Sequence, residues 1–432
     1  MTDIKKNTSS TELIKSIVRN LGVKGLAIPM SFASGVLLAR YMGSESYGVY
    51  GLLLSIATVI CSGIIRFNSI LLVREISAAI TKKEDKYILG SVLVSMLVVV
   101  ITIIAVMVGV EVLALLGIVT SEYLIPVIIL MLVLTCVGSI LRGFDKTAVG
   151  LFTEQAVRPT TQTVLLLILA SGSVVGVNIS LEQGVNSLLL AILIAVMFGL
   201  LNIFRVFSRQ IVSKGVGVKR EWLTQTLPSL TVLGWSQGLN TQLPTLLIGW
   251  LLLASDVGTY KVADAMSGLI SLTLIAANVA LGPKIAAASA NKNKELFEHL
   301  LRTATTMVVL IAVPLAVFFI LVGNVVIPFV FGQEYAQATT FFWILCVSQL
   351  VNSFCGPVMM ALNMLKREKD NVKAVFVSLI ITMSLGLFLI PSYGLIGAAL
   401  AQLIGVCVWN FYLVWILFSR ENILCIPYLW KK

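Results

Sequence analysis

The sequence predicts an all-α membrane protein with about twelve transmembrane helices, arranged as two parallel lobes of six helices with both termini in the cytoplasm. The 432-residue chain is 58% hydrophobic and 12% charged, with a mean hydropathy of +1.00, whereas a soluble domain carries about 25% charged residues. Apolar stretches of about 20 residues, the length that crosses a bilayer, recur along the chain. Its 31 Lys and Arg residues gather in short segments between these stretches. This pattern orients membrane proteins and gives no reason to expect a nucleic-acid partner.

The N-terminal residues 1–24 are expected to form an amphipathic helix on the cytoplasmic surface. Leu13, Ile17 and Leu21 fall on one helical face, and residues 1–22 contain no apolar core of a cleavable signal. The remaining chain divides into an N-lobe, a cytoplasmic linker, a C-lobe and a cytoplasmic tail at 25–204, 205–226, 227–418 and 419–432. The predicted spans lie near 25–42, 48–73, 87–110, 123–141, 159–178, 184–204, 227–253, 257–282, 303–323, 338–363, 372–391 and 394–418.

The basic residues distinguish the two sides of the membrane. Seven segments, including both termini and a predicted loop at 142–158, contain 28 of the 31 basic residues. The intervening loops contain no Lys or Arg but do contain Glu45, Glu111, Glu182 and Glu334. Because positively charged loops stay in the cytoplasm, both termini are predicted to be cytoplasmic.

The two halves of the chain show a weak internal repeat. A shift of 210 positions places Gly48 on Gly258, Tyr50 on Tyr260 and Arg74 on Lys284. Six spans in each half give both halves the same orientation, so the repeat is parallel. Two such lobes around a cleft are a common arrangement for alternating access.

Residues that carry enzymatic chemistry do not form a recognisable motif. The chain has no phosphate-binding Gly-x-x-x-x-Gly-Lys and no nucleophile–base pair. The six cysteines show neither a disulfide framework nor the spacing of a metal site. The predicted external loops are short and leave little protein outside the membrane for a water-soluble active site. We therefore expect a transporter, not an enzyme, with no cofactor and no metal.

Three basic residues lie outside the cytoplasmic clusters: Arg40 at the outer end of the first span, Arg66 in the second and Lys261 in the eighth. A charge at the centre of a membrane helix costs at least about 2.5–3.5 kcal/mol, so it is retained beside a partner, a watery cavity or a ligand. We expect these three residues to bind substrate in a cationic cavity. The structural alternatives are snorkelling of either arginine to the interface and an ion pair between Lys261 and Asp264.

Polar side chains at helical spacing are expected to line the same cavity. Asp264 is the acid best placed within a helix and is the candidate for ion coupling, because a carboxylate beside Lys261 could respond to a proton or a sodium ion. Interhelical hydrogen bonding is the structural alternative for the other polar side chains. The predicted lining residues are Ser62, Ser69, Ser236, Asn240, Ser271, Asn278 and Asn352.

Short motifs along the whole chain resemble one family. They are Leu38-Ala39-Arg40-Tyr41, Tyr47-Gly48-Val49-Tyr50, Leu72-Val73-Arg74-Glu75-Ile76, Glu154-Gln155-Ala156-Val157-Arg158-Pro159, Gly258-Thr259-Tyr260-Lys261-Val262-Ala263 and Tyr393-Gly394-Leu395-Ile396-Gly397-Ala398-Ala399. In order and spacing they are similar to the polysaccharide and O-antigen flippases of the multidrug/oligosaccharidyl-lipid/polysaccharide (MOP) exporter superfamily.

The resemblance implies two six-helix lobes around a cationic cavity in the bacterial inner membrane. The implied substrate is an undecaprenyl-pyrophosphate-linked O-antigen or exopolysaccharide unit, and the implied partners are a polysaccharide polymerase and a chain-length regulator. Arg66 and Lys261 fall on helices where relatives place cationic cavity residues. Arg40 lies further out on its helix than the resemblance leads us to expect.

Two other functions are consistent with the sequence. A cation-coupled multidrug exporter requires buried carboxylates, of which Asp264 is the one well-placed candidate. A non-transporting scaffold for envelope assembly requires no cavity residues. Dye efflux and the sidedness of lipid-linked glycan in a deletion strain distinguish these functions from a flippase.

Overall fold

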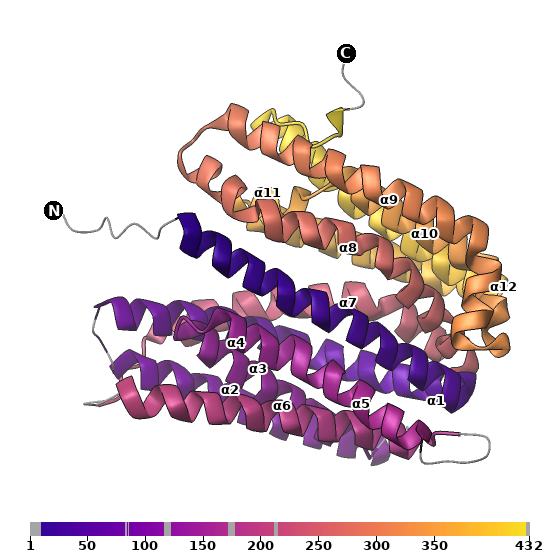
Figure 1. The fold of residues 1–432 in the computed structure, drawn as a ribbon, viewed down its shortest axis with the longest axis horizontal. Coiled ribbons are helices and arrows are strands. Elements are labelled where there is room, and N and C mark those ends of the chain that lie inside the picture. Colours follow the sequence, from indigo (N-terminus) through magenta and orange to yellow (C-terminus); the bar gives the residue numbers. More distant parts are fainter. Residues whose placement is uncertain are drawn as a thin grey trace. The chain divides into compact units, whose positions relative to one another are not determined.

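A computed structural model describes residues 10–82, 84, 86–115, 122–171, 178–210 and 215–428. Within these ranges the regular structure is entirely helical (Figure 1). The helices are α1 Ser10–Lys82, α2 Lys86–Leu115, α3 Leu124–Gly143, α4 Thr147–Leu151, η1 Phe152–Val157, α5 Arg158–Ser171, α6 Leu181–Gln210, η2 Trp222–Thr226, α7 Leu227–Leu251, α8 Ala254–Ala290, α9 Lys294–Phe331, η3 Gln333–Ala338, α10 Thr339–Cys355, α11 Val358–Met364 and α12 Glu368–Glu421.

Eight helical segments of the described chain are long and apolar enough to cross a membrane. The two longest, which include α1 and α12, each contain an interruption. α1 has 73 residues, which would measure ~110 Å if straight, and α12 has 54 residues. A bilayer is only ~45 Å thick including its headgroups, so each of these two helical segments must turn back. Both breaks occur at glycines with positive φ, Gly43 at 78° and Gly394 at 56°, a conformation that a side chain disfavours.

The break at Gly43 lies in the predicted turn 43–47, and the break at Gly394 directly follows the predicted turn 392–393. The described N-terminus differs from the expectation, because α1 runs without a break from Ser10 to Gly43. The expected surface helix at 1–24 is thus continuous with the first span from residue 10 onward, and residues 1–9 lie outside the described part. The count of about twelve spans and the side on which the termini lie stay predictions.

The predicted loop at 142–158 is wrong. Arg142 belongs to α3, and the chain is helical again from Thr147 through α4, η1 and α5. Five charged residues lower the hydropathy of this segment and make its helical part difficult to recognise from the sequence. The structure compensates by pairing Arg142 with Glu154.

The chain forms two compact units. Unit 1 comprises Met1–Ser34, Ile60–Ser173 and Val185–Gly234, and unit 2 comprises Gly35–Val59, Val174–Gly184 and Trp235–Lys432. A core of unit 1 joins α1, α2 and α3 through buried residues that include Leu72, Ile76, Ile88, Ile140 and Phe144. A core of unit 2 joins α8, α9, α11 and α12 through buried residues that include Ile285, Leu301, Val358, Leu362 and Leu413.

Segments outside the spans also pack on their own unit. In unit 1, Lys219 Nζ lies 2.6 Å from Glu75 Oε2 and above the ring of Tyr87, and Trp222 is fully buried beside Tyr87. In unit 2, the residues after α12 lie along α9, where the guanidinium of Arg302 covers the ring of Tyr428. The linker and the tail are therefore ordered in these parts.

Candidate functional site

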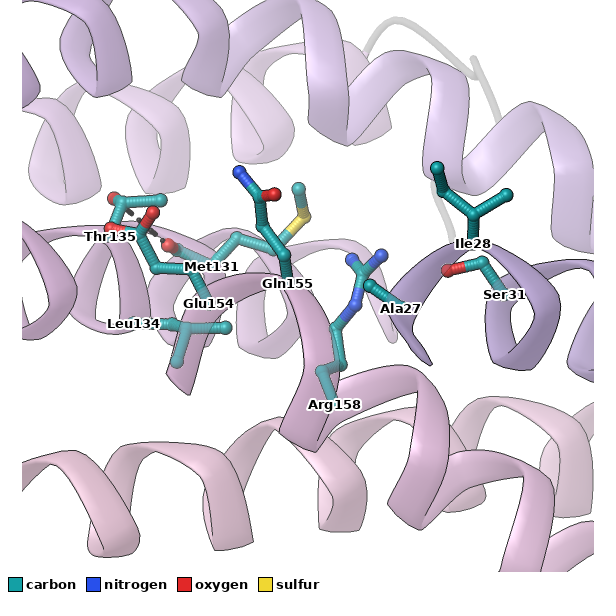
Figure 2. Close-up of a pocket in the computed structure, with 9 residues that line it drawn as sticks. All are labelled: Ala27, Ile28, Ser31, Met131, Leu134, Thr135, Glu154, Gln155 and Arg158. Atoms are coloured by element: carbon teal, nitrogen blue, oxygen red, sulfur yellow. Dashed lines mark hydrogen bonds between the residues drawn. The ribbon is translucent and has the colours of Figure 1, made fainter. Parts of the chain in front are cut away.

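Unit 1 contains a cavity of about 420 Å³ with charged residues in its wall (Figure 2). Figure 2 shows Arg158 pointing toward the part of α1 that carries Ala27 and Ser31, whereas Glu154 lies on the side of Thr135. α1, α3 and the η1–α5 segment build the wall. The lining residues are Ala27, Ile28, Ser31, Met131, Leu134, Thr135, Glu154, Gln155 and Arg158.

A π-helix positions the polar part of this wall. η1, Phe152–Val157, carries Glu154 and Gln155, and Arg158 opens the α-helix that follows. π-helical turns are rare and often occur at functional sites, because the extra residue changes which side chains face inward. The local geometry therefore marks this segment as more than a connection between two spans.

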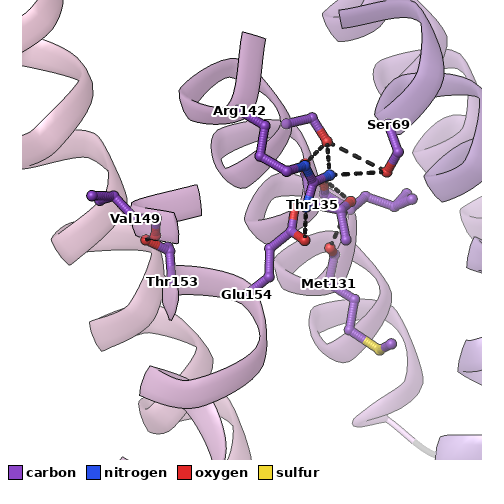
Figure 3. A network of polar contacts seen from close by, with 9 residues as sticks. Ser69, Met131, Thr135, Arg142, Val149, Thr153 and Glu154 are labelled. Carbon is purple, nitrogen blue, oxygen red and sulfur yellow. Dashed lines mark hydrogen bonds and ion pairs between the residues drawn. The ribbon is translucent and has the colours of Figure 1, made fainter. Parts of the chain in front are cut away.

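Glu154 belongs to a polar network inside unit 1 (Figure 3). Its Oε2 forms an ion pair with Arg142, whose Nη2 also donates to Ser139 Oγ at 2.8 Å and to Ser69 Oγ at 3.3 Å. The side chains of Arg142 and Glu154 are only 13% and 12% exposed. Gly138 makes room for the pair, since a methyl group there would collide with the Glu154 side chain. The other carboxylate oxygen, Oε1, is buried and has no hydrogen-bond partner among the described residues.

Unit 2 contains a smaller polar cavity of about 260 Å³. It brings together Asn240 of α7, Asp264 of α8 and Asn352 of α10, all three of which the sequence predicts as cavity residues. Asn240 Oδ1 accepts a hydrogen bond from Ser378 Oγ at 3.2 Å. The lining residues are Asn240, Thr241, Pro244, Asp264, Gly268, Gln349, Asn352, Ser378, Thr382, Gln402, Val406 and Trp409.

Lys261 lies one turn from Asp264 on α8. The ion pairs of the described residues do not include these two side chains. Lys261 Nζ instead donates to Gln242 Oε1 at 3.0 Å, and the same oxygen accepts from Ser55 Oγ at 2.9 Å. Gly51 leaves space for the lysine stem, because a methyl group there would lie 3.2 Å from Lys261 Cγ. The Lys261 side chain is therefore held by an amide oxygen and by no salt bridge of the described residues.

Arg40 and Arg66 lie outside the walls of these two cavities. Arg40 is exposed and its Nη1 donates to the carbonyl of Phe329 at 3.3 Å, near the C-terminus of α9. A cation is favourable at a helix C-terminus, which agrees with an interfacial position. Arg66 is half-buried on α1 beside Gly234 of α7, where a methyl group would lie 3.0 Å from Arg66 Cβ.

The remaining predicted residues are dispersed. Ser69 contacts the Arg142 network. Ser271 donates to the carbonyl of its own helix at Gly268, and the half-buried Asn278 has an Oδ1 without a partner among the described residues. Ser62 is half-buried and Ser236 is buried.

Sequence reasoning missed Arg142, Glu154 and Arg158 because it assigned them to a loop. A signal was present, since Glu154 and Arg158 lie in one of the motifs that carry the family resemblance. Gln155 and, in the unit 2 cavity, Gln402 were also missed, because an amide in a membrane helix more often serves packing than binding.

Among the described residues, no group of three His, Cys, Asp or Glu side chains is placed to hold a metal ion. All six cysteines are free. Burial raises the pKa of the Cys425 thiol, in the tail after α12, to about 11. That thiol is therefore protonated at neutral pH and a poor nucleophile.

Comparisons with known proteins support one family. Residues 37–340 match a family described as polysaccharide biosynthesis protein. Over 163 residues the chain is 26% identical to a protein of Haloferax volcanii named as a probable low-salt glycan biosynthesis flippase. The match covers 38% of this chain and 34% of that protein, so it spans about a third of the relative's length.

Solved structures of MOP transporters share the fold. An inward-facing multidrug resistance transporter of the MATE family matches with a TM-score of 0.71 and 13% identity, over 94% of this chain and 98% of that one. The lipid II flippase MurJ in an inward closed conformation matches with a TM-score of 0.69 and 15% identity, over 94% and 88%. A MOP superfamily transporter from Pyrococcus furiosus matches with a TM-score of 0.64 and 15% identity, over 94% and 95%. These likenesses confirm the predicted all-α membrane fold.

Proposed function

The chain belongs to the family of polysaccharide biosynthesis proteins, and from this premise we propose that it flips a lipid-linked oligosaccharide across the membrane. The observation that carries the proposal is the family match over residues 37–340 of a multi-pass helical chain. The substrate we propose is an undecaprenyl-pyrophosphate-linked O-antigen or exopolysaccharide unit. It moves from the cytoplasmic to the outer leaflet of a bacterial inner membrane by alternating access, and a polymerase and a chain-length regulator act on it afterwards.

Arg66 in unit 1 and Lys261 in unit 2 are the residues we assign to the anionic headgroup. Each is a cationic side chain on a largely apolar helix. Placing such a charge in a membrane costs free energy unless it contacts a partner, water or a ligand. Charge-assisted hydrogen bonds from guanidinium and ammonium groups suit a pyrophosphate. The membrane potential favours this direction of transport, since exporting a negative charge from a negative interior gains about 2.3 kcal/mol per 100 mV.

Asp264 is the residue we assign to ion coupling. It lines the unit 2 cavity with several amide and hydroxyl side chains, including Asn240, Asn352 and Thr382, and oxygen ligands suit a small hard cation or a proton. If coupling occurs there, Asp264→Asn should make export independent of the sodium or proton gradient. Export by Asp264→Asn that keeps the gradient dependence of the natural protein argues against this assignment.

The function itself is tested in a deletion strain. We expect lipid-linked glycan to accumulate in the cytoplasmic leaflet, where it resists a glycan-cleaving enzyme added from outside, and we expect the natural chain to restore export. Normal export in the deletion strain would disprove the flippase proposal, provided that no second flippase gene is present.

A cation-coupled exporter is the second candidate, because each unit places a carboxylate in a cavity, Glu154 in unit 1 and Asp264 in unit 2. Arg142 neutralises Glu154 through their ion pair, which makes this function the weaker of the two. Efflux of a cationic dye that depends on the chain, without any change in glycan sidedness, would favour the exporter. Neither dye efflux nor a change in sidedness would favour a scaffold.

A further inference from the structure

Two oppositely charged side chains of α8, Lys261 and Asp264, are neighbours that do not pair. Residues three apart on a helix have Cβ atoms about 5–6 Å apart, and opposite charges at this spacing stabilise a helix by pairing. Neither side chain is exposed, and the attraction between charges is stronger inside a protein than in water. The ion pairs of the described residues nevertheless do not include these two. Their separation therefore needs a structural cause.

A glutamine of α7 holds the lysine. Gln242 Oε1 accepts from Lys261 Nζ at 3.0 Å and from Ser55 Oγ of α1 at 2.9 Å. Because an ammonium can only donate, the amide must present its oxygen to Lys261 and not its nitrogen. Gly51 provides space for the lysine stem, since a methyl group there would lie 3.2 Å from Lys261 Cγ. The ammonium therefore has its partner on α7.

A second glutamine, Gln402 of α12, holds the aspartate. Its side chain forms a hydrogen bond with the Asp264 carboxylate, and its Oε1 accepts from the Tyr260 hydroxyl. Because an ionised carboxylate can only accept, the amide nitrogen of Gln402 is the atom that serves Asp264. Tyr260 is buried and stacks on Phe341 of α10, so it fixes the orientation of this amide. The carboxylate therefore has its partner on α12.

We propose that the two glutamines are positioning residues that keep Lys261 and Asp264 from pairing, so that each charge stays available to its own ligand. This inference rests on the headgroup and ion-coupling roles proposed above for these two residues. Without the glutamines, the ammonium and the carboxylate turn to each other and form an ion pair. That pair competes with the anionic headgroup for Lys261 and with the coupling cation for Asp264.

The alternative is that the two amides serve packing alone, as hydrogen bonds between membrane helices often do. Gln242 links α7 to α1 and α8, and Gln402 links α12 to α8. The two roles make different predictions. Loss of a packing contact is not repaired by a change at Asp264, whereas loss of a positioning contact is repaired when the charge of Asp264 is removed.

Binding of inorganic pyrophosphate to the full-length protein in lipid nanodiscs, titrated calorimetrically, distinguishes these roles. Gln242→Met keeps a flexible side chain of similar length but lacks the amide oxygen. We expect it to weaken pyrophosphate binding at least about tenfold, and the added change Asp264→Asn to restore the affinity to within about threefold, as is typical of coupled charges. Gln337→Met is the matched control, because Gln337 is an exposed glutamine of unit 2.

Two further variants test the same mechanism from other directions. Gln402→Met releases the carboxylate instead of the ammonium, so it should also weaken pyrophosphate binding, and Asp264→Asn should again restore it. This variant keeps the test informative if Gln242→Met does not fold. Gln242→Glu places a carboxylate directly beside Lys261, so pyrophosphate binding should be lost and Asp264→Asn should not restore it.

Weakened binding that Asp264→Asn fails to restore in both methionine variants would overturn the proposal, because the glutamines would then serve packing alone. Unchanged binding in both methionine variants would overturn it as well. Pyrophosphate binding that is absent from the natural chain, or that survives Lys261→Ala, would count against the headgroup role and this inference together. The sidedness of the glycan in the deletion strain tests the flippase function separately from all of these measurements.

Discussion

Arg142 and Glu154 hold opposite charges among mostly apolar helices, and each needs the other. Removing one partner of a buried ion pair leaves an uncompensated charge, which typically costs roughly 3–5 kcal/mol, whereas replacing both by apolar residues costs little. We therefore expect Arg142→Ala to lower the unfolding midpoint of the purified protein strongly. The double variant Arg142→Met, Glu154→Met should unfold close to the natural protein. Equal destabilisation by the single and double variants would show that the pair's role is not charge compensation.

Arg66 and Lys261 are expected to act on transport and not on folding. Replacing either by Ala should abolish glycan export while immunoblots show normal abundance, because a neutral side chain cannot form charge-assisted hydrogen bonds to a pyrophosphate. Arg66→Lys and Lys261→Arg should keep partial export, although Lys lacks the bidentate fork of Arg. The exposed Arg220→Ala serves as control. Full export by the Arg66→Ala, Lys261→Ala double variant would rule out the headgroup role.

At the scale of elements, α1 and α8 cross in unit 2 at two glycines that the sequence repeat places in equivalent positions. A methyl group at Gly48 would collide with the carbonyl of Ala254, and one at Gly258 would collide with the carbonyl of Ser44. The backbones of α1 and α8 are thus in direct contact at these glycines. Gly48 and Gly258, which the repeat makes equivalent, meet as equivalent residues do at a two-fold axis. This contact gives the weak repeat a structural cause.

Gly48→Ala and Gly258→Ala should each lower the stability of unit 2. The added methyl group meets backbone and not a flexible side chain, so the helices must separate at a cost of roughly 1–3 kcal/mol. Gly268→Ala is the control on the same helix, since nothing lies within 4 Å of its added methyl group. It should be neutral or stabilising by up to about 1 kcal/mol. Thermal unfolding in detergent measures all three, and a tolerated Gly258→Ala would mean that the crossing is looser than the structure indicates.

The elements also show what sequence alone can predict. Long apolar stretches and the glycines at 43 and 394 determine spans and turns, because hydropathy and backbone freedom are local properties. Glu154 and Arg142 stabilise each other across twelve positions and two helices, and this pairing is not a local property. Hydropathy averaged along the sequence is low around these charges and therefore predicts a loop, whereas the folded chain buries the two side chains together. The unit 2 cavity was predictable in part, since Asn240, Asp264 and Asn352 each lie on polar faces of their own helices.

At the scale of the whole molecule, the two units contain discontinuous parts of the chain. α1 contributes to both units, with Gly35–Val59 in unit 2 and its flanking segments in unit 1. α7 likewise divides at Gly234 and Trp235. Both helices contain an internal proline, Pro29 and Pro244, which removes a backbone hydrogen bond and weakens the helix locally.

Membrane topology provides the last prediction. Each long helix with a glycine break must cross the bilayer twice, because α1 would be ~110 Å long if straight. Reporter enzymes that are active only outside the cytoplasm should be active when fused near Glu45, Glu111, Glu182 and Glu334. They should be silent when fused near Lys82, Lys214, Lys292 and Lys369, since basic loops remain inside.

The two fusions that follow Gly43, near Glu45 and near Lys82, make the sharpest comparison. Glu45 lies just after the break, and Lys82 ends the same helix, so opposite activities are expected within one continuous element. The fusion pairs of the second half, at Glu334 and Lys369, should repeat this pattern because a parallel repeat gives both lobes one orientation. If the reporter activities in the second half followed the opposite pattern to those in the first half, the repeat would be inverted. The contact between Gly48 and Gly258 would then need a cause other than two-fold symmetry along the membrane normal.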